Sequence, residues 1–161
     1  MFKNNKGITI VSLVVMIIVI LILLAVGLTT GLELLRDTKM KRSITTMLLI
    51  NSVASGIKES YDFDESNELV GTLVDAGSED LNISGIVDRT DWYKWGIDEL
   101  EEYGIRTDMV TLKNEAYFLV KYGVEPDDPY VIDIVYSQGV EEVSGDRIWS
   151  LRRMLISQNL E

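Results

Sequence analysis

The sequence predicts an α+β protein in which a long N-terminal helix, membrane-embedded in its first half and amphipathic in its second, packs on a small antiparallel-sheet head. Three observations predict this fold. The 21 residues of Ile8–Leu28 carry no charge. Residues 32–61 contain no proline and repeat apolar residues every three or four positions. Two apolar runs rich in β-formers follow toward the C-terminus, and a helix followed by a small sheet is α+β.

These features divide the 161 residues into four segments. Residues 1–7 form a short basic N-terminal segment. Residues 8–28 form a transmembrane helix, and residues 29–61 continue it as an amphipathic helix. Residues 62–161 form an acidic globular head. We therefore expect a cell-membrane protein with a single span.

The apolar segment is long enough to cross a bilayer, because a helix of 21 residues measures roughly 30 Å. A strand of this length without a break would be unusual. A cleaved secretory signal has an apolar core of only about 7–15 residues, so Ala25-Val26-Gly27 is a weak cleavage site. A plain single-span anchor remains open. A dimerising helix is indicated only weakly by the spacing of Gly27 and Gly31.

The second half of the helix is predicted to pack under the head. Six of its eight charged residues lie just beyond the apolar segment, at positions 33–42. Its apolar residues follow helical spacing and are expected to face the head. These residues are Ile44, Met47, Leu48, Ile50, Ala54 and Ile57.

The head is predicted to combine short helices with two strands. Asp91–Tyr103 is predicted to be a short helix, and its Trp92, Trp95 and Leu100 are expected to lie in the core. We expect Trp149 to lie in the core as well.

Two apolar runs are predicted to be antiparallel strands joined by a loop, Glu115–Tyr122 and Tyr130–Tyr136. Gly139 and Gly145 are expected to mark turns. Asp146–Ile156 is predicted to be a terminal helix or turn.

Composition excludes several function classes. The chain has no cysteine and no histidine, which excludes disulfides, the usual zinc and haem ligands, and Ser-His-Asp or Cys-His catalysis. After Gly31 it carries 13 Lys/Arg against 26 Asp/Glu, which disfavours nucleic-acid binding, since that needs clustered basic residues. The sequence contains no recognisable pair of a nucleophile and a general base, so we expect no enzymatic activity and no cofactor.

One acidic stretch has the alternating oxygen spacing of a calcium loop, with Asp62, Asp64 and Glu68 as candidate ligands. It lacks the glycine at the sixth position, and Leu73 stands where the bidentate acid would be. The same residues are typical of a solvated acidic surface, which is the interpretation we favour over a metal site.

The start of the chain is more specific. Lys6-Gly7-Ile8-Thr9-Ile10-Val11, placed directly before an unbroken apolar helix, resembles the leader of type IV prepilins and pseudopilins. The resemblance implies that a prepilin peptidase cuts the Gly7–Ile8 bond and methylates the new amine of Ile8. It implies a pilin-like fold and a filament subunit, with the peptidase, an assembly-platform membrane protein, a cytoplasmic assembly ATPase and other pilins as partners.

The C-terminal region is similar to the closing strand–turn segment of pilin-like proteins of clostridia and related Gram-positive bacteria. That similarity lies in residues 131–136, Gly139-Val140, Gly145 and Trp149-Ser150-Leu151. Together the two resemblances imply a type IV pilus or a type II secretion-like pseudopilus. The apolar segment would anchor the subunit in the membrane before assembly, with the N-terminus cytoplasmic and the head outside.

The chain departs from the family pattern at several positions. The usual first mature residue is phenylalanine and here it is Ile8, while Ser12 replaces the usual glutamate at the fifth mature position. Because that glutamate is thought to pair with a neighbour's terminal amine, Ser12 indicates a minor subunit. The usual mid-helix proline is missing, and Gly27 and Gly31 are candidates for the local helix melting seen in assembled pilins.

The basic residues near the apolar segment favour the opposite topology. Lys3 and Lys6 precede the segment, whereas four Lys/Arg follow it between positions 36 and 42. The positive-inside rule would then place the head in the cytoplasm. This conflict keeps an alternative open, an uncleaved single-pass membrane protein with a soluble acidic module that serves in binding or as an adaptor.

Overall fold

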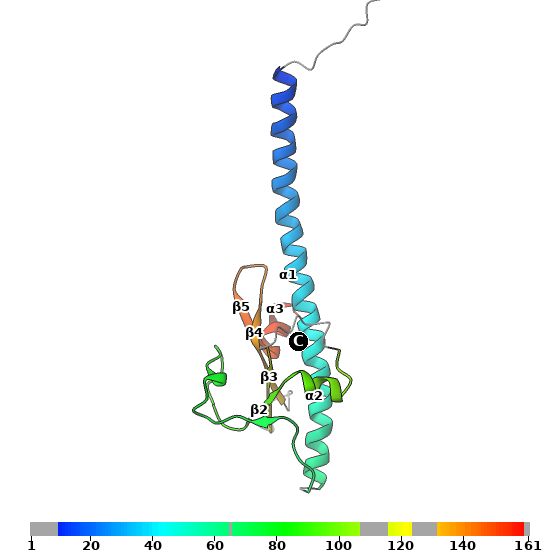
Figure 1. Ribbon diagram of the computed structural model, residues 1–161, viewed down its shortest axis with the longest axis vertical. Helices are drawn as coiled ribbons and strands as arrows, with labels where there is room; N and C mark the ends of the chain where they lie inside the picture. Colours follow the sequence, from blue (N-terminus) through cyan, green and yellow to red (C-terminus); the bar gives the residue numbers. More distant parts are fainter. Residues whose placement is uncertain (1–9, 65, 107–115, 124–131, 160–161) are drawn as a thin grey trace, which may run out of the picture. The chain divides into compact units, whose positions relative to one another are not determined.

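The computed structural model describes residues 10–64, 66–106, 116–123 and 132–159. By contacts it divides into two units, residues 1–36 and residues 37–161. Figure 1 shows the succession of elements along the chain. Their bounds are α1 Ile10–Phe63, β1 Thr72–Leu73, a 3₁₀ turn Glu79–Leu81, β2 Trp92–Trp95, α2 Ile97–Glu102, β3 Phe118–Tyr122, β4 Ile132–Glu141, β5 Arg147–Ser150 and α3 Leu151–Ser157.

The second unit is built on one five-stranded sheet in the order β1-β2-β3-β4-β5, with every neighbouring pair antiparallel. The central pair, β3 and β4, runs in register from Phe118 opposite Tyr136 to Tyr122 opposite Ile132. The predicted α+β class and the predicted antiparallel pairing of these two strands are confirmed. β3 begins at Phe118, three residues later than expected, and β4 continues to Glu141. The predicted first residues of the second strand, Tyr130 and Val131, lie outside the described residues.

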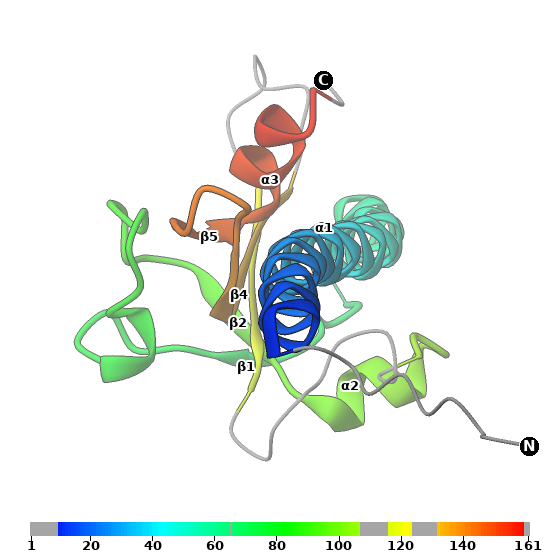
Figure 2. The same ribbon diagram turned by 90° about the horizontal axis from the view of Figure 1, so that it is seen from above.

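The amphipathic part of α1 supplies one side of the main core. Figure 2 shows the part of α1 that belongs to the second unit on one face of the sheet. Ile44, Met47, Ile50 and Ala54 are buried there together with the inward-facing residues of β2, β3 and β4. Their spacing of three and four positions places them on one side of the helix.

Two details of that helix face differ from the prediction. Leu48 is 41 % exposed, because a step of one residue from Met47 turns the side chain about 100° around the helix. Met40 is buried in the core although it was not predicted to be. Ile57, at the other end of the face, is only partly buried.

A second, smaller apolar cluster lies on the opposite face of the sheet. The segment of residues 74–91 runs over that face (Figure 2). Val74 and Leu81 from the segment pack with Trp92, Leu119 and Val135 from the strands. The sheet therefore has a covered surface on both sides, so β2 and β3 bury residues of both alternating sets.

The prediction of one helix over Asp91–Tyr103 is wrong in its first half. Trp92–Trp95 is strand β2, and only Ile97–Glu102 is helical. Aromatic residues favour strands, and β2 gains backbone pairing with β1 on one side and β3 on the other. Trp92, Trp95 and Leu100 are nevertheless buried, as predicted.

The C-terminal expectations also need correction. Gly139 does not lie in a turn but within β4, at a register irregularity between Val135 and Val140. Its φ of +60° is a left-handed conformation that glycine adopts readily. Gly145 does lie in a turn, where its N–H donates to the carbonyl of Glu142.

The predicted terminal helix or turn at Asp146–Ile156 is split in the structure. Arg147–Ser150 forms strand β5, and the helix α3 begins at Leu151. The Ser150 hydroxyl accepts a hydrogen bond from the N–H of Arg153, which caps the helix. Trp149 therefore lies on a strand, and it is partly buried against the second cluster.

We expect Gly139→Ala to destabilise the head by about 2–4 kcal/mol. An added Cβ would lie 2.8 Å from the Trp149 ring and 2.9 Å from Arg147 Cγ, so overpacking adds to the cost of a left-handed alanine. Gly145→Ala is the matched control, because its φ is +96° but no atom lies within 4 Å of the added Cβ. Urea unfolding should show a clearly smaller loss for the control, and equal losses would contradict the packing argument.

Candidate functional site

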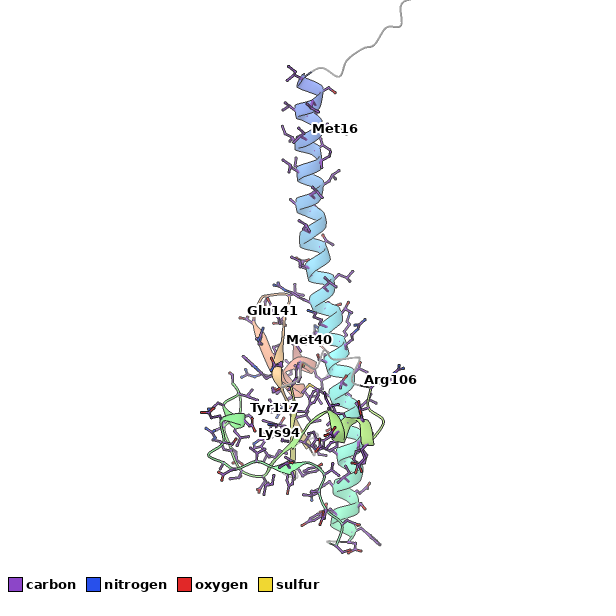
Figure 3. The ribbon with its side chains drawn as sticks, in the orientation of Figure 1. Met16, Met40, Lys94, Arg106, Tyr117 and Glu141 are labelled. Atoms are coloured by element: carbon purple, nitrogen blue, oxygen red, sulfur yellow. The ribbon has the colours of Figure 1, made fainter. Side chains whose placement is uncertain are left out.

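The first unit presents a helix whose apolar side chains are uncovered. The large hydrophobic residues of α1 between Leu13 and Leu35 are each 44 to 66 % exposed. Their side chains, Met16 among them, project outward along the helix (Figure 3). An apolar surface of this extent is unfavourable in water and marks a contact with lipid or with another protein.

Among the residues that the structure describes, α1 is the one helix long and apolar enough to cross a membrane. The mean hydropathy of its most apolar 18-residue window is 3.1, and none of that window is buried within the chain. A helix in a soluble core would be covered by its own chain, whereas a membrane span and a signal sequence both have this composition. By length and composition, the helix is compatible with membrane anchoring.

Three residues at the beginning of the chain are predicted to act in processing and assembly. Gly7 and Ile8, the predicted cleavage and methylation site, lie outside the described residues. Ser12 lies in the first turn of α1 and is exposed. The roles of all three stay predictions.

Gly27 and Gly31 lie inside an unbroken stretch of α1. No atom lies within 4 Å of a Cβ added at either position, so both glycines leave a small area of open helix surface. Between them, the Thr30 hydroxyl donates to the carbonyl of Val26 at 3.1 Å, a bond that competes mildly with helix geometry. The predicted melting concerns the assembled filament and remains a prediction.

The three candidate calcium ligands lie around the end of α1 and in the loop after it. Asp62 pairs with Lys58 at 2.5 Å. Asp64 accepts a hydrogen bond from the N–H of Ser66, which lowers the pKa of Asp64. Within the described part of the chain, no three acidic side chains are grouped so that they could hold a metal ion. In the structure, the Asp62 carboxylate pairs with a lysine, and the Asp64 carboxylate accepts a hydrogen bond within a turn.

The outer face of the sheet carries a set of polar contacts that the sequence analysis did not identify. Lys94 lies 3.0 Å from Asp80 and 4.1 Å from the centre of the Tyr117 ring, and both labelled side chains are visible in Figure 3. Lys121 pairs with Asp88. Both lysines project from strands toward the segment of residues 74–91 and help to fasten it to the sheet.

The ionisation of two of these groups follows from the same contacts. The hydrogen bond from Lys121, with further bonds from Thr90, lowers the pKa of Asp88 to about 2. The benefit of that pairing is therefore complete above the ordinary pKa of 3.8 and is lost as the pH falls through about 2. Burial, followed by the charge of Asp80, raises the pKa of Tyr117 to about 12. Its phenol donates to the Asp80 carbonyl at 3.1 Å.

The alternation of side chains along β2 and β3 indicates in the sequence which face of the sheet carries the two lysines. Lys94 follows Trp92 by two positions, and Lys121 follows Leu119 by two, so each lysine shares a sheet face with an apolar residue. What the strands alone did not reveal is the segment that covers this face. No protein-family model, curated protein or solved structure matches the chain.

Proposed function

We propose that this chain is a structural subunit, and a minor one, of a type IV pilus or a type II secretion-like pseudopilus. One observation carries the proposal: Lys6-Gly7 stands directly before an uncharged segment of 21 residues. The described part of that segment is a helix whose apolar side chains are not buried by the rest of the chain. Cleavage after Gly7 would leave that segment on the mature protein. A secretory signal peptide, in contrast, is removed together with its apolar segment.

The mechanism is packing. Before assembly, residues 8–28 are embedded in lipid with the N-terminus on the cytoplasmic side and the acidic head outside. In the filament, these helices exchange contacts with lipid for contacts with one another, so the apolar surface stays out of water throughout. The acidic heads face the solvent, where their shared negative charge favours solubility.

This function requires a prepilin peptidase, an assembly-platform membrane protein, a cytoplasmic assembly ATPase and other pilins. It is tested by shearing filaments from cells of the native host. The protein should be recovered in the sheared fraction when the assembly ATPase is present and only in the membrane fraction when it is deleted. A filament role would be contradicted if the membranes of both strains contained the same amount of the protein and the sheared fraction of neither strain contained any.

The uncharged Ser12 supports the minor-subunit assignment. A carboxylate at this position of a lipid-embedded helix has a high desolvation cost unless it is paired. In a filament it could pair with the terminal amine of an adjoining subunit. A subunit without the carboxylate lacks this pairing, so its position at the tip, where one neighbour is missing, carries no penalty.

We therefore expect Ser12→Glu to raise the amount of this protein in filaments. The new carboxylate would lie about one helical turn from the amine of Ile8, and pairing between subunits should favour incorporation along the shaft. The measurement is the ratio of this protein to the major pilin in purified filaments, with Ser12→Gln as the uncharged control of similar size. An unchanged ratio, at equal expression and cleavage, would mean that contacts of the head decide the position.

A second candidate function is favoured by the basic residues. Four Lys/Arg follow the apolar segment within positions 36–42 and two precede it, which disagrees with an outside head. The alternative is an uncleaved single-pass protein with an acidic binding or adaptor module. It differs from the pilin in keeping Met1–Gly7.

A further inference from the structure

Positive charge is densest in one short stretch of the chain, and a second group of three arginines lies at Arg147, Arg152 and Arg153. Residues 36–42 contain four Lys/Arg within seven positions, whereas residues 43–140 contain six Lys/Arg against 20 Asp/Glu. Three of the four lie in the second unit, on the first turns of α1 within it. We call Lys39, Lys41 and Arg42 the basic collar. The collar is therefore a positive region at the beginning of a strongly negative head.

The three side chains are available to bind something. All three are exposed. Lys41 pairs with Asp37 at 2.7 Å, but its side chain is still 62 % exposed, and such surface pairs contribute little. Among the described residues, no carboxylate lies within salt-bridge distance of Lys39 or Arg42. The collar thus carries charge that the described part of the head does not neutralise.

The collar is close in sequence to the membrane-embedded segment. Lys39 lies 11 residues beyond Leu28, and 11 residues of helix measure about 16 Å. The headgroup layer covers about the first 6 Å beyond the hydrocarbon. Side chains on a helix lean toward its N-terminus, here toward the lipid. The ammonium of Lys39 can therefore lie within about 10 Å of the headgroups, which is the screening length at moderate salt.

We propose that the basic collar binds the anionic headgroups of phospholipids around the membrane-embedded helix. The proposal rests on the membrane anchoring given under Proposed function. Because the remainder of the head is acidic, anionic lipid attracts the collar and repels the rest of the head, which favours one orientation of the head on the membrane. Binding to anionic headgroups would also give the basic residues that follow the apolar segment a role other than setting topology.

The test uses the full chain reconstituted into vesicles, and the absence of cysteine allows a single label. Thr45→Cys places a fluorophore one turn beyond Arg42 on the exposed side of α1. Energy transfer from this label is measured to a trace of headgroup-labelled phosphatidylglycerol and, separately, to labelled phosphatidylcholine. The vesicles contain equal parts of the two unlabelled lipids, at low and at high salt.

We expect transfer to phosphatidylglycerol to exceed transfer to phosphatidylcholine several-fold at low salt. Each basic residue near an anionic surface contributes about fivefold in lipid affinity, so Lys39→Gln with Arg42→Gln should bring the two transfers to near equality. High salt should do the same. The matched control is Arg147→Gln with Arg153→Gln, which removes two exposed charges elsewhere in the head and should leave the preference intact.

Other results overturn the proposal. Equal loss of the preference in the control pair would mean that net charge and not the collar is responsible. A signal that depends on protein density but not on lipid charge would assign the collar to a second copy of the chain. A chain that inserts into the vesicles and shows no preference contradicts the collar alone, whereas a chain that fails to float with vesicles of either lipid contradicts the membrane anchoring itself.

Discussion

Replacing Gly7 with leucine is expected to leave Met1–Gly7 attached to the chain in cells that process the wild-type protein fully. In the family that the leader resembles, the peptidase cuts after a glycine, and a leucine side chain would occupy the place where the enzyme accepts only a hydrogen. The expected effect is near-complete loss of cleavage. Mass spectrometry of the protein from native membranes measures it, together with the amount in sheared filaments.

The control for this substitution is Asn4→Leu, which places the same side chain in the leader three residues before the scissile bond. It should be cut normally, and the unprocessed Gly7→Leu protein should remain in the membrane fraction. If Gly7→Leu is processed as fully as the control, the scissile bond is not Gly7–Ile8, and the resemblance loses its main support.

A second large effect is expected in the head, for Met47→Lys. Met47 is fully buried between α1 and the sheet, so the lysine either buries an unpaired charge or forces the helix away from the core. We expect a loss of about 3–5 kcal/mol in the free energy of unfolding. Urea unfolding of the full chain in detergent, followed by tryptophan fluorescence, measures it.

The adjacent residue provides the control for that experiment. Leu48 is 41 % exposed at the border of the apolar helix face, so Leu48→Lys should change stability by less than about 1 kcal/mol. Both substitutions add the same charge one residue apart on the same helix. Similar losses of unfolding free energy for the two variants would contradict the burial of Met47 against the sheet. A larger loss for Leu48→Lys would mean that Leu48, and not Met47, faces the core.

Helical periodicity predicted much of the head's main core. Ile44, Met47, Ile50 and Ala54 follow from spacing alone, because they share one side of the helix and that side packs into the main core. The same reasoning failed for Leu48, which lies at the border of the apolar face. A pattern of threes and fours does not define where that border falls, since both Met47 and Leu48 fit it.

The strand that begins and ends with a tryptophan, β2, was harder to predict. Trp92–Trp95 carries a buried residue at each end, a pattern that a short helix also produces. What decides for a strand is the pairing with β1 and β3, and such long-range partners are not visible in a local window. The sequence also does not distinguish a turn at Gly139 from the bulge observed there, because both favour glycine.

The candidate functional residues divide in the same way. The exposed apolar helix could be predicted for the part of the segment that the structure describes, since its exposure follows from composition and length. The contacts of Lys94 and Lys121 with the segment of residues 74–91 could not, because they join residues 14 and 33 positions apart. The acidic candidates Asp62 and Asp64 looked alike in sequence, and only the structure separates them into a lysine pair and a turn.

The most direct test of the filament-subunit proposal is the intact mass of the protein purified from the membranes of a host with an active prepilin peptidase. The proposal predicts a chain that lacks Met1–Gly7, begins at Ile8 and carries one additional methyl group on its terminal amine. Fragmentation of the N-terminal peptide would place that methyl group. A full-length, unmethylated chain beginning at Met1 would contradict the account and favour the uncleaved single-pass protein.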